Sequence, residues 1–250
     1  MIILIGTGHV FNLTEPLHQV FDSEHPDLIC VELDQQRYQA LVMRQQEQAQ
    51  VKKPVRNVPL IYRVLARFQE SMADQYGVIP GNEMLAAITY AQNHQLPVEL
   101  IDMNAQHLFT TMWKSMTLRE RFRLFLTGFR GLFIGKQRVE EELKNYQADV
   151  TGYLDEIGKI FPTIKHTLID RRNEHMVKRL QILQQKYETV AACVGDGHLP
   201  GMEELLEQYK IDYKSIHLDE LQKKHSEPSV SSAGFSITVN SSFPSIENKK

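Results

Sequence analysis

The sequence Gly-x-Gly-His occurs twice in the chain, at residues 6–9 and 195–198, close to its two ends. Each copy directly follows a short apolar run, MIILI in the first case and TVAACV in the second. Continuous apolar runs of this length are typical of parallel strands that are buried on both faces. Ligands of an open α/β sheet bind at the carboxyl ends of its strands. We therefore expect His9 and His198 to face one another at one sheet edge, in a metal or catalytic site.

Strand and helix patterns alternate along much of the chain, which predicts an α/β fold. The expected architecture is a mainly parallel central sheet flanked by helices, with right-handed crossovers between the strands. In addition to the strands at 1–5 and 189–194, strands are predicted at 27–33, 98–102 and 213–218, and helices at 14–21, 35–48, 59–76, 83–94 and 200–209. The expected N-caps are Thr14, Asp34 and Asn82.

A long helical insertion separates the third predicted strand from the fourth. Helical patterns extend from about residue 104 to about residue 186, within the usual error of element boundaries. Residues 1–225 are expected to form one domain that includes this insertion. The polar residues 226–250 are expected to form a disordered tail.

One segment of the insertion, residues 118–135 (LRERFRLFLTGFRGLFIG), is basic, amphipathic and rich in Phe and Leu. Phe and Leu at helical spacing usually belong to a core, so this segment is expected to pack on the sheet or on a second subunit of a homodimer. The alternative is a helix that lies on a membrane surface, as a peripheral contact, or in a partner's groove.

The composition excludes several classes of protein. A formal net charge of −3 gives no general attraction to nucleic acid. The first residues enter a strand directly, without the features of a secretory signal, and no apolar run is long enough to cross a membrane. Cys30 and Cys193 fall within predicted strands and are expected to be core residues rather than a disulfide. These features predict a cytoplasmic location.

Three acidic residues are candidates for the site at the carboxyl edge. Glu32 follows CV in a predicted strand, where a core would favour an apolar residue, so it either takes part in the site or faces solvent. Glu83 follows a Gly-Asn turn at a predicted helix N-terminus, where it either complements the helix dipole or serves as a metal ligand or general base. Asp102 ends the third predicted strand and should point to the same edge.

Arg37, Arg172 and Asn173 are the remaining candidates. Arg37 lies on the helix after Glu32 and is expected to pair with Glu32 or to bind a carboxylate or phosphate. Arg172 and Asn173 belong to a polar run at 170–173 that lies either on a solvated face or in a cleft, where an arginine would stabilise an oxyanion. The eight other histidines lack a comparable context and are expected at the surface.

Together these motifs resemble the TraB/PrgY family, which is part of the wider TraB–Tiki superfamily. The resemblance extends from Ile2 to about Leu218. The segments that carry it are, in order, 6–10, 31–34 with Arg37 and Tyr38, 81–84, 100–102, 172–173 with Met176, and 194–201. Their order and spacing are more specific than any one segment.

The resemblance implies an α/β fold similar to that of erythromycin esterase and ChaN-like proteins. Tiki-type members resemble proteases that depend on manganese or cobalt, and TraB/PrgY members are linked to the inhibition of peptide sex pheromones in bacteria, known as pheromone shutdown. Carried over to this chain, the implied metal ligands are His9, His198, Glu32 and Glu83, and the implied supporting charges are Arg37 and Arg172.

Two features depart from the family's pattern. Met103 and Asn104 follow Asp102 where the family usually continues Arg-Asp, so this turn is expected to contribute less to charge pairing. Many PrgY-like members also carry a C-terminal membrane segment, whereas this sequence ends in polar residues.

The leading functional hypothesis is a metal-dependent hydrolase, in particular a peptidase. A manganese, cobalt or zinc ion would polarise the scissile carbonyl, Glu32 or Glu83 would act as ligand or general base, and Arg37 or Arg172 would face the developing oxyanion. The alternative is a non-catalytic protein that sequesters a peptide or a haem-like ligand, with the Phe-rich insertion as an apolar wall. A third hypothesis is a regulator that acts at a membrane surface through residues 118–135.

Overall fold

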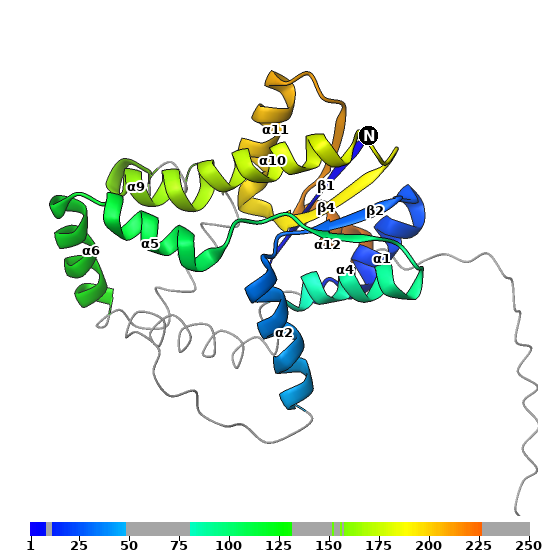
Figure 1. Ribbon diagram of the computed structural model, residues 1–250, viewed down its shortest axis with the longest axis horizontal. Coiled ribbons are helices and arrows are strands. Elements are labelled where there is room, and N and C mark those ends of the chain that lie inside the picture. Colours follow the sequence, from blue (N-terminus) through cyan, green and yellow to red (C-terminus); the bar gives the residue numbers. More distant parts are fainter. Residues whose placement is uncertain (9–11, 49–80, 132–151, 153–155, 157, 227–250) are drawn as a thin grey trace, which may run out of the picture.

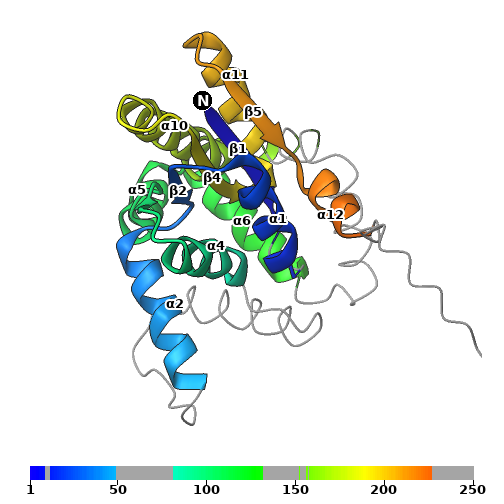
Figure 2. The ribbon, with the colours of Figure 1, turned by 90° about the vertical axis from the view of Figure 1, so that its right-hand side faces the viewer.

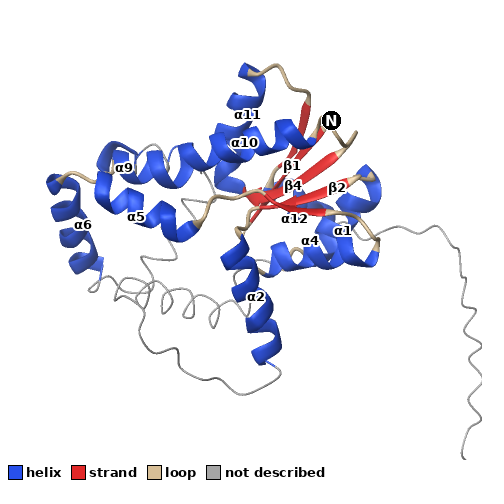
Figure 3. Ribbon diagram, viewed as in Figure 1, coloured by secondary structure: helices blue, strands red, loops and turns tan. Residues whose placement is uncertain are grey.

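The computed structural model describes residues 1–8, 12–48, 81–131, 152, 156 and 158–226 (Figure 1). Strands and helices alternate as predicted, and the fold is α/β (Figure 3). His9, the predicted helix at 59–76, residues 132–135 of the amphipathic segment and the tail from residue 227 lie outside the described residues.

Five parallel strands form the sheet. They are β1 (Ile2–Thr7), β2 (Leu28–Val31), β3 (Val98–Leu100), β4 (Val190–Gly195) and β5 (Tyr213–Ile216). Their order is β3-β2-β4-β1-β5, so two strands from distant parts of the chain, β1 and β4, are neighbours in the sheet. Thr7 is in register with Gly195 at the carboxyl ends of this pair. The described parts of both Gly-x-Gly-His motifs therefore lie side by side at one sheet edge, as predicted.

Helices make up much of the rest of the described chain. Those in the strand-and-helix part are α1 (Thr14–Glu24), α2 (Gln35–Gln48), α4 (Asn82–Asn93), α10 (Arg171–Leu183), α11 (Leu199–Gln208) and α12 (Leu218–Ser226). Those of the insertion are α5 (Ala105–Ser115), α6 (Leu118–Gly131) and α9 (Pro162–Lys165). Two short turns complete the set, the π-helix η1 (His166–Asp170) and the 3₁₀ helix η2 (Asp196–His198).

Alternate residues of β1, β2 and β4 enter two separate cores, which explains why the sequences of these three strands are almost wholly apolar. Ile3 and Ile5 of β1 belong to the core shared with α1, α4 and α12. Ile2 and Leu4 belong to the core shared with α10 and α11 on the other face. Figure 2 shows the sheet between these helix layers. α12 was not predicted, yet Leu221 anchors it because the side chain is completely buried.

Two of the predicted helix caps are wrong. Thr14 is already the first residue of α1, and its amide donates to Asn12 Oδ1 at 3.2 Å. α4 is preceded by Gly81 rather than Asn82, and Gly81 has a φ of 92°. Because most residues disfavour positive φ, glycine is the natural residue at this position.

The described chain between β3 and β4 consists mainly of helices joined by short turns, as predicted. Figure 1 shows α5, α6 and α9 beside the sheet rather than on it, with α6 farthest away. α6 therefore does not pack on the sheet, and the other expected positions of the segment, on a second subunit, on a membrane surface or in a partner's groove, stay predictions. In the part of the chain that the structure describes, no helix combines the length and apolarity needed to cross a bilayer.

Glu120 joins α6 to α9. Its Oε2 accepts hydrogen bonds from the amide and the hydroxyl of Thr117, both at 2.9 Å, which closes a capping box at the start of α6. Its Oε1 accepts from the amide of Thr163 at 2.9 Å. Burial alone would raise the pKa of Glu120, but the hydrogen bonds from Thr163 and Thr117 outweigh it and lower this pKa below 4.5.

The lowered pKa predicts how the stability of the protein depends on pH. The contribution of the Glu120 carboxylate should be fully present above the unfolded pKa of 4.5 and be lost as the pH falls through the lower folded pKa. In urea unfolding, the difference between wild type and Glu120→Gln should therefore shrink as the pH is lowered through this range. The control is Glu174→Gln, whose half-exposed side chain lies 3.8 Å from Lys178 and whose effect should stay small. An effect of Glu120→Gln that does not change with pH would contradict the assignment.

Candidate functional site

The carboxyl edge of the sheet gathers polar groups from three neighbouring strands. Glu32 follows β2, Asp102 follows β3, and His198 is the last residue of the η2 turn that follows β4. All three side chains are buried although they lie at the end of the strands. The strand register holds them there, because the Glu32 amide donates to Cys193 O at 3.0 Å and the Asp102 amide donates to Leu33 O at 3.2 Å.

Arg172 on α10 connects two of these groups. Its guanidinium binds Asp102 through two hydrogen bonds, Nε to Oδ1 at 2.9 Å and Nη2 to Oδ2 at 2.7 Å. Nη2 also donates to Glu32 Oε1, and Nη1 donates to Leu168 O in the π-helical turn at 3.2 Å. The side chain is only 13% exposed. Burial alone would lower the pKa of Arg172, but Glu32 and Asp102 outweigh it and raise this pKa, so the guanidinium stays charged.

Arg37, on α2, also binds Asp102 rather than Glu32. Its Nη1 donates to Asp102 Oδ2 at 2.8 Å, whereas the expectation allowed a pair with Glu32. Asp102 thus lies between two arginines. The expectation that this turn contributes less to charge pairing is wrong, because Asp102 itself makes the pairs and does not need the residues that follow it.

Asp34 holds the turns that carry Arg37 and Asp102. Its Oδ1 accepts from the amides of Gln36 at 2.7 Å and Arg37 at 3.0 Å, so it caps α2 as predicted. Its Oδ2 accepts from the amide of Ala105 at the start of α5 at 3.0 Å. One buried carboxylate therefore fixes the starts of two helices on either side of the site.

Glu32 is held as a carboxylate. Oε2 accepts from the Gly195 amide at 2.6 Å, and Oε1 faces both Arg172 and His198. Burial alone would raise the pKa of Glu32. When the His198 ring is protonated, the charges of His198 and Arg172 and the hydrogen bonds from His198 and Gly195 outweigh burial and keep this pKa well below 4.5. Glu32 is therefore suited to attract a cation rather than to accept a proton near neutral pH.

His198 is buried and oriented by Asn173. Its Nδ1 lies 2.6 Å from Asn173 Oδ1. Because an amide oxygen only accepts hydrogen bonds, Nδ1 carries the proton, and in the neutral ring Nε2 presents a lone pair. Nε2 lies 3.5 Å from Glu32 Oε1. In this neutral form a lone pair and a carboxylate oxygen face one another inside the protein, whereas a proton on Nε2 would make an ion pair with Glu32.

This pair of atoms fits a divalent cation. Two ligands at about 2.1 Å from a tetrahedral cation lie about 3.4 Å apart, which matches the separation of Nε2 and Oε1. A hydrogen bond from the second ring nitrogen is also the usual partner of a metal-binding histidine. Among the described residues, no cluster of three or more His, Cys, Asp or Glu side chains could hold a metal ion. His9 lies outside the described residues, so its role as a ligand stays a prediction.

Glu83 lies on the opposite side of the sheet from Arg172. It is buried at the start of α4, and α4 packs with α1 on that face. Burial raises the pKa of the Cys193 thiol, and the charge of Glu83 raises it further, which places the two groups near each other. The described contacts of Glu32 are with Arg172, His198 and Gly195, and the predicted role of Glu83 as a second acidic ligand stays a prediction.

The glycines of the motifs make room for side chains of the site. A Cβ on Gly195 would lie 3.3 Å from Glu32 Oε2, and a Cβ on Gly6 would lie 2.1 Å from Asp196 Oδ1. A Cβ on Gly201, in α11, would lie 2.4 Å from Asn173 Nδ2. These glycines are therefore required for close approach, in addition to the tight turns that the sequence suggested.

Gly201→Ala should destabilise the protein although alanine favours helices. Asn173 is 2% exposed and cannot move aside, so the added Cβ should cost about 1–3 kcal/mol in urea unfolding and disturb the Asn173–His198 hydrogen bond. The control is Gly158→Ala, whose Cβ would meet the flexible end of Lys165 at 2.6 Å and should be tolerated. Equal stability of the two variants would contradict this account of Gly201. The ¹⁵N shifts of the His198 ring report the hydrogen bond directly.

Sequence reasoning missed a second polar group at the same edge. His217, after β5, lies with Nδ1 3.4 Å from Asp196 Oδ1 and Nε2 3.3 Å from Glu203 Oε1. Asp196 also accepts from the Leu218 amide at 2.9 Å, which fixes the start of α12. Asp196 belongs to the second Gly-x-Gly-His motif, which was a signal, but its partner His217 follows the next strand, β5, and carries no motif of its own.

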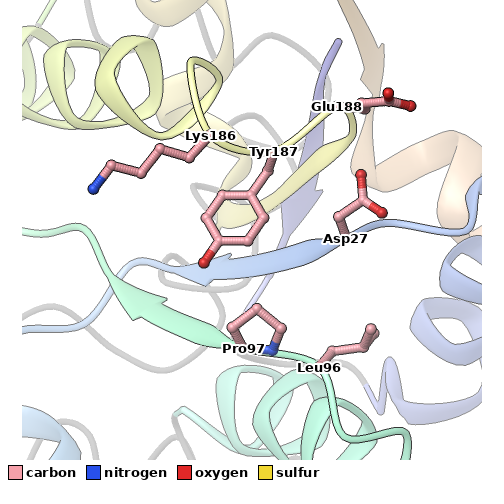
Figure 4. A pocket seen from close by; sticks show the side chains of 6 residues that line it. All are labelled: Asp27, Leu96, Pro97, Lys186, Tyr187 and Glu188. Atoms are coloured by element: carbon pink, nitrogen blue, oxygen red, sulfur yellow. The ribbon is translucent and has the colours of Figure 1, made fainter.

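A shallow hollow lies at the other end of the strands. It has a volume of about 400 Å³ and is lined by Asp27, Leu96, Pro97, Lys186, Tyr187 and Glu188 (Figure 4). Asp27 and Pro97 precede β2 and β3, and Glu188 precedes β4, so this hollow is at the amino edge. It is separate from the group around Glu32 and His198.

Comparison with known proteins agrees with the arrangement of motifs. The model of the TraB/PrgY/gumN family matches residues 1–213. An uncharacterized protein of Methanocaldococcus jannaschii is 29% identical, over 97% of this chain and 63% of its own length. This chain therefore spans less than two thirds of that relative. Because the family match covers both motifs and the strands that carry them, the chain belongs to the TraB/PrgY/gumN family.

Proposed function

We propose that the carboxyl edge of the sheet is the site of a divalent-metal-dependent hydrolase that acts on peptides. The observation that carries the proposal is the buried pair of His198 Nε2 and Glu32 Oε1, 3.5 Å apart. A lone pair that faces a carboxylate inside a protein is unfavourable unless a proton or a metal ion lies between them. Asn173 and Gly195 hold the two groups in place, which favours a permanent binding site.

Manganese, cobalt or zinc is the candidate ion, with His198 and Glu32 as ligands and His9 and Glu83 as proposed further ligands. A divalent ion at this position would polarise a substrate carbonyl and activate water. The protein's own residues have distinct tasks. Asn173 sets the direction of the His198 ring. Arg172 binds Asp102 and Glu32 together and so holds the Glu32 carboxylate in position.

Arg37 is the proposed contact to substrate. Its side chain is 36% exposed, whereas Arg172 is almost fully buried and committed to two carboxylates. A guanidinium at the border of the site can bind the carboxylate of a peptide or a developing oxyanion. Membership of the TraB/PrgY/gumN family supports the peptide as substrate class through the resemblance to metal-dependent proteases of the Tiki type.

A cleavage screen with a mixed peptide library tests the proposal. The purified chain is treated with a chelator, then supplied with Mn²⁺, Co²⁺ or Zn²⁺, and the products are read by mass spectrometry. We expect cleavage that is lost with the chelator and restored by at least one of these ions. Peptide binding without cleavage under all conditions would instead indicate a sequestering protein. Cleavage that the chelator leaves unchanged would exclude a metal-dependent mechanism.

A further inference from the structure

The helix α6 carries an exposed apolar face that is unlike the rest of the described surface. Phe122 and Phe125 are 65% and 70% exposed, and Leu118 and Leu126 are exposed beside them. These residues are spaced i, i+4, i+7 and i+8, which places them on one side of a helix. Glu120, on the opposite side, is buried against Thr163 and so orients this face outward.

Arginines border the apolar face on both sides. At 100° per residue, Arg119 and Arg123 lie along one border and Arg121 along the other. Arg121 Nη2 donates to Trp113 O at 2.7 Å, and Arg123 Nη1 donates to Ile160 O at 3.1 Å. These two hydrogen bonds hold the guanidinium groups beside the face, so the cationic border is fixed by α5, by α6 and by the residues just before α9.

The charge of this region is opposite in sign to that of the whole chain. Residues 113–131 contain five Lys or Arg and one acid, Glu120, whereas the chain has a formal net charge of −3. Glu120 is occupied by the hydroxyls and amides of Thr117 and Thr163 and does not face outward. The outer surface of α6 therefore combines large apolar side chains with positive charge only.

We infer that α6 docks on an anionic lipid bilayer, with Leu118, Phe122, Phe125 and Leu126 in the interface and the arginines against the headgroups. A helix with a Phe and Leu face and a cationic border is the type that lies in the plane of a membrane. The half-exposed indole of Trp113 on α5 lies 5.2 Å from the guanidinium of Arg121. Aromatic rings of this kind favour the headgroup region of a bilayer.

Charge decides between a bilayer and a second copy of the chain. A symmetric dimer through this face would bring the arginine borders of the two copies together, and like charges disfavour such contact. An anionic bilayer offers the complementary charge along the whole face. The inference does not depend on the proposed hydrolytic site, since α6 lies at the far end of the insertion from the sheet (Figure 1).

Vesicle binding of the full chain tests the inference. The chain is sedimented with phosphatidylcholine vesicles, with or without phosphatidylglycerol, at low and high salt. We expect binding only to the anionic vesicles, weakened by salt. Trp113, on α5 beside Arg121 of α6, is the chain's single tryptophan, so a blue shift of the tryptophan fluorescence would report contact next to α6.

Exposed residues provide variants that should leave the fold intact. Phe122→Ser with Phe125→Ser should weaken binding on the order of 100-fold, because two large side chains no longer enter the interface. Arg119→Gln should weaken it about fivefold. The controls are Ile182→Ser and Lys178→Gln, both exposed on α10, which should bind as the wild type does. Far-UV circular dichroism checks that each variant is folded.

Three results would overturn the inference. These are equal binding to neutral and anionic vesicles, absence of binding to either, and full binding by the double phenylalanine variant. Sedimentation velocity is measured in parallel. A dimer of the wild type that the double variant converts to a monomer would assign the face to a second copy of the chain instead.

Discussion

Arg172→Met should lower the free energy of unfolding by about 3–5 kcal/mol, the usual effect of breaking a buried ion pair. The substitution keeps most of the side-chain volume but removes the charge that Glu32 and Asp102 share. Both carboxylates are less than 10% exposed, so water cannot replace the guanidinium. The remaining contact of Asp102 with Arg37 does not reach Glu32.

Arg179→Met is the matched control for this prediction. Arg179 lies on the same helix and binds Glu99 at 2.8 Å, but both side chains are more than 40% exposed. Its loss should change the stability by no more than about 1 kcal/mol. The two variants are compared by urea unfolding at neutral pH. Similar losses of unfolding free energy in both variants would contradict the claim that burial makes the Arg172 ion pairs more stabilising than the exposed Arg179 pair.

His198→Ala should reduce the proposed metal-dependent peptide hydrolysis on the order of 10³-fold, because it removes the ring nitrogen that faces Glu32. Asn173→Ala keeps the ring but removes the hydrogen bond that directs it, and should reduce metal affinity or activity about 10- to 100-fold. The informative result is that His198→Ala should lose more activity than Asn173→Ala.

His25→Asn is the control for the histidine variants. His25 lies before β2, at the amino edge of the sheet, and asparagine tolerates its positive φ of 47°. Activity and stability should both stay close to the wild type. Hydrolysis that survives in His198→Ala at the wild-type rate, with the variant folded, would remove His198 from the mechanism.

The sheet could be predicted from the sequence because its strands have a simple physical signature. β1 and β4 are buried on both faces, so their sequences are apolar without alternation. Parallel strands have their carboxyl ends at the same edge of the sheet, which is why Glu32, Asp102 and His198 were all predicted at one edge. The cap Asp34 was predicted correctly because an aspartate directly before a helix accepts hydrogen bonds from the free amides of the first turn.

Specific pairs within the site could not be predicted, since they join residues far apart in the chain. Arg172 binds Glu32 across 140 positions and Asp102 across 70, and only the packing of α10 on the sheet brings them together. Sequence proximity suggested Glu32 as the partner of Arg37, but the rigid start of α2 directs Arg37 to Asp102. Gly81 displaced the predicted cap Asn82 because the turn requires a positive φ.

The glycines show how a correct motif can be given an incomplete explanation. Gly-x-Gly-His suggested tight turns, but Gly6 and Gly195 have no positive φ in the structure. Their absent side chains leave room for Asp196 and Glu32 instead. Such close approaches depend on which side chain arrives from another strand, and that information is not local in the sequence.

Calorimetric titration of the full chain with Mn²⁺, Co²⁺ and Zn²⁺ tests most directly whether Glu32 and His198 hold a metal ion. The account predicts about one ion bound per chain. Binding should be lost in His198→Ala and in Glu32→Gln and be retained in His25→Asn. Absence of binding by the folded wild type, or undiminished binding by both site variants, would contradict the account.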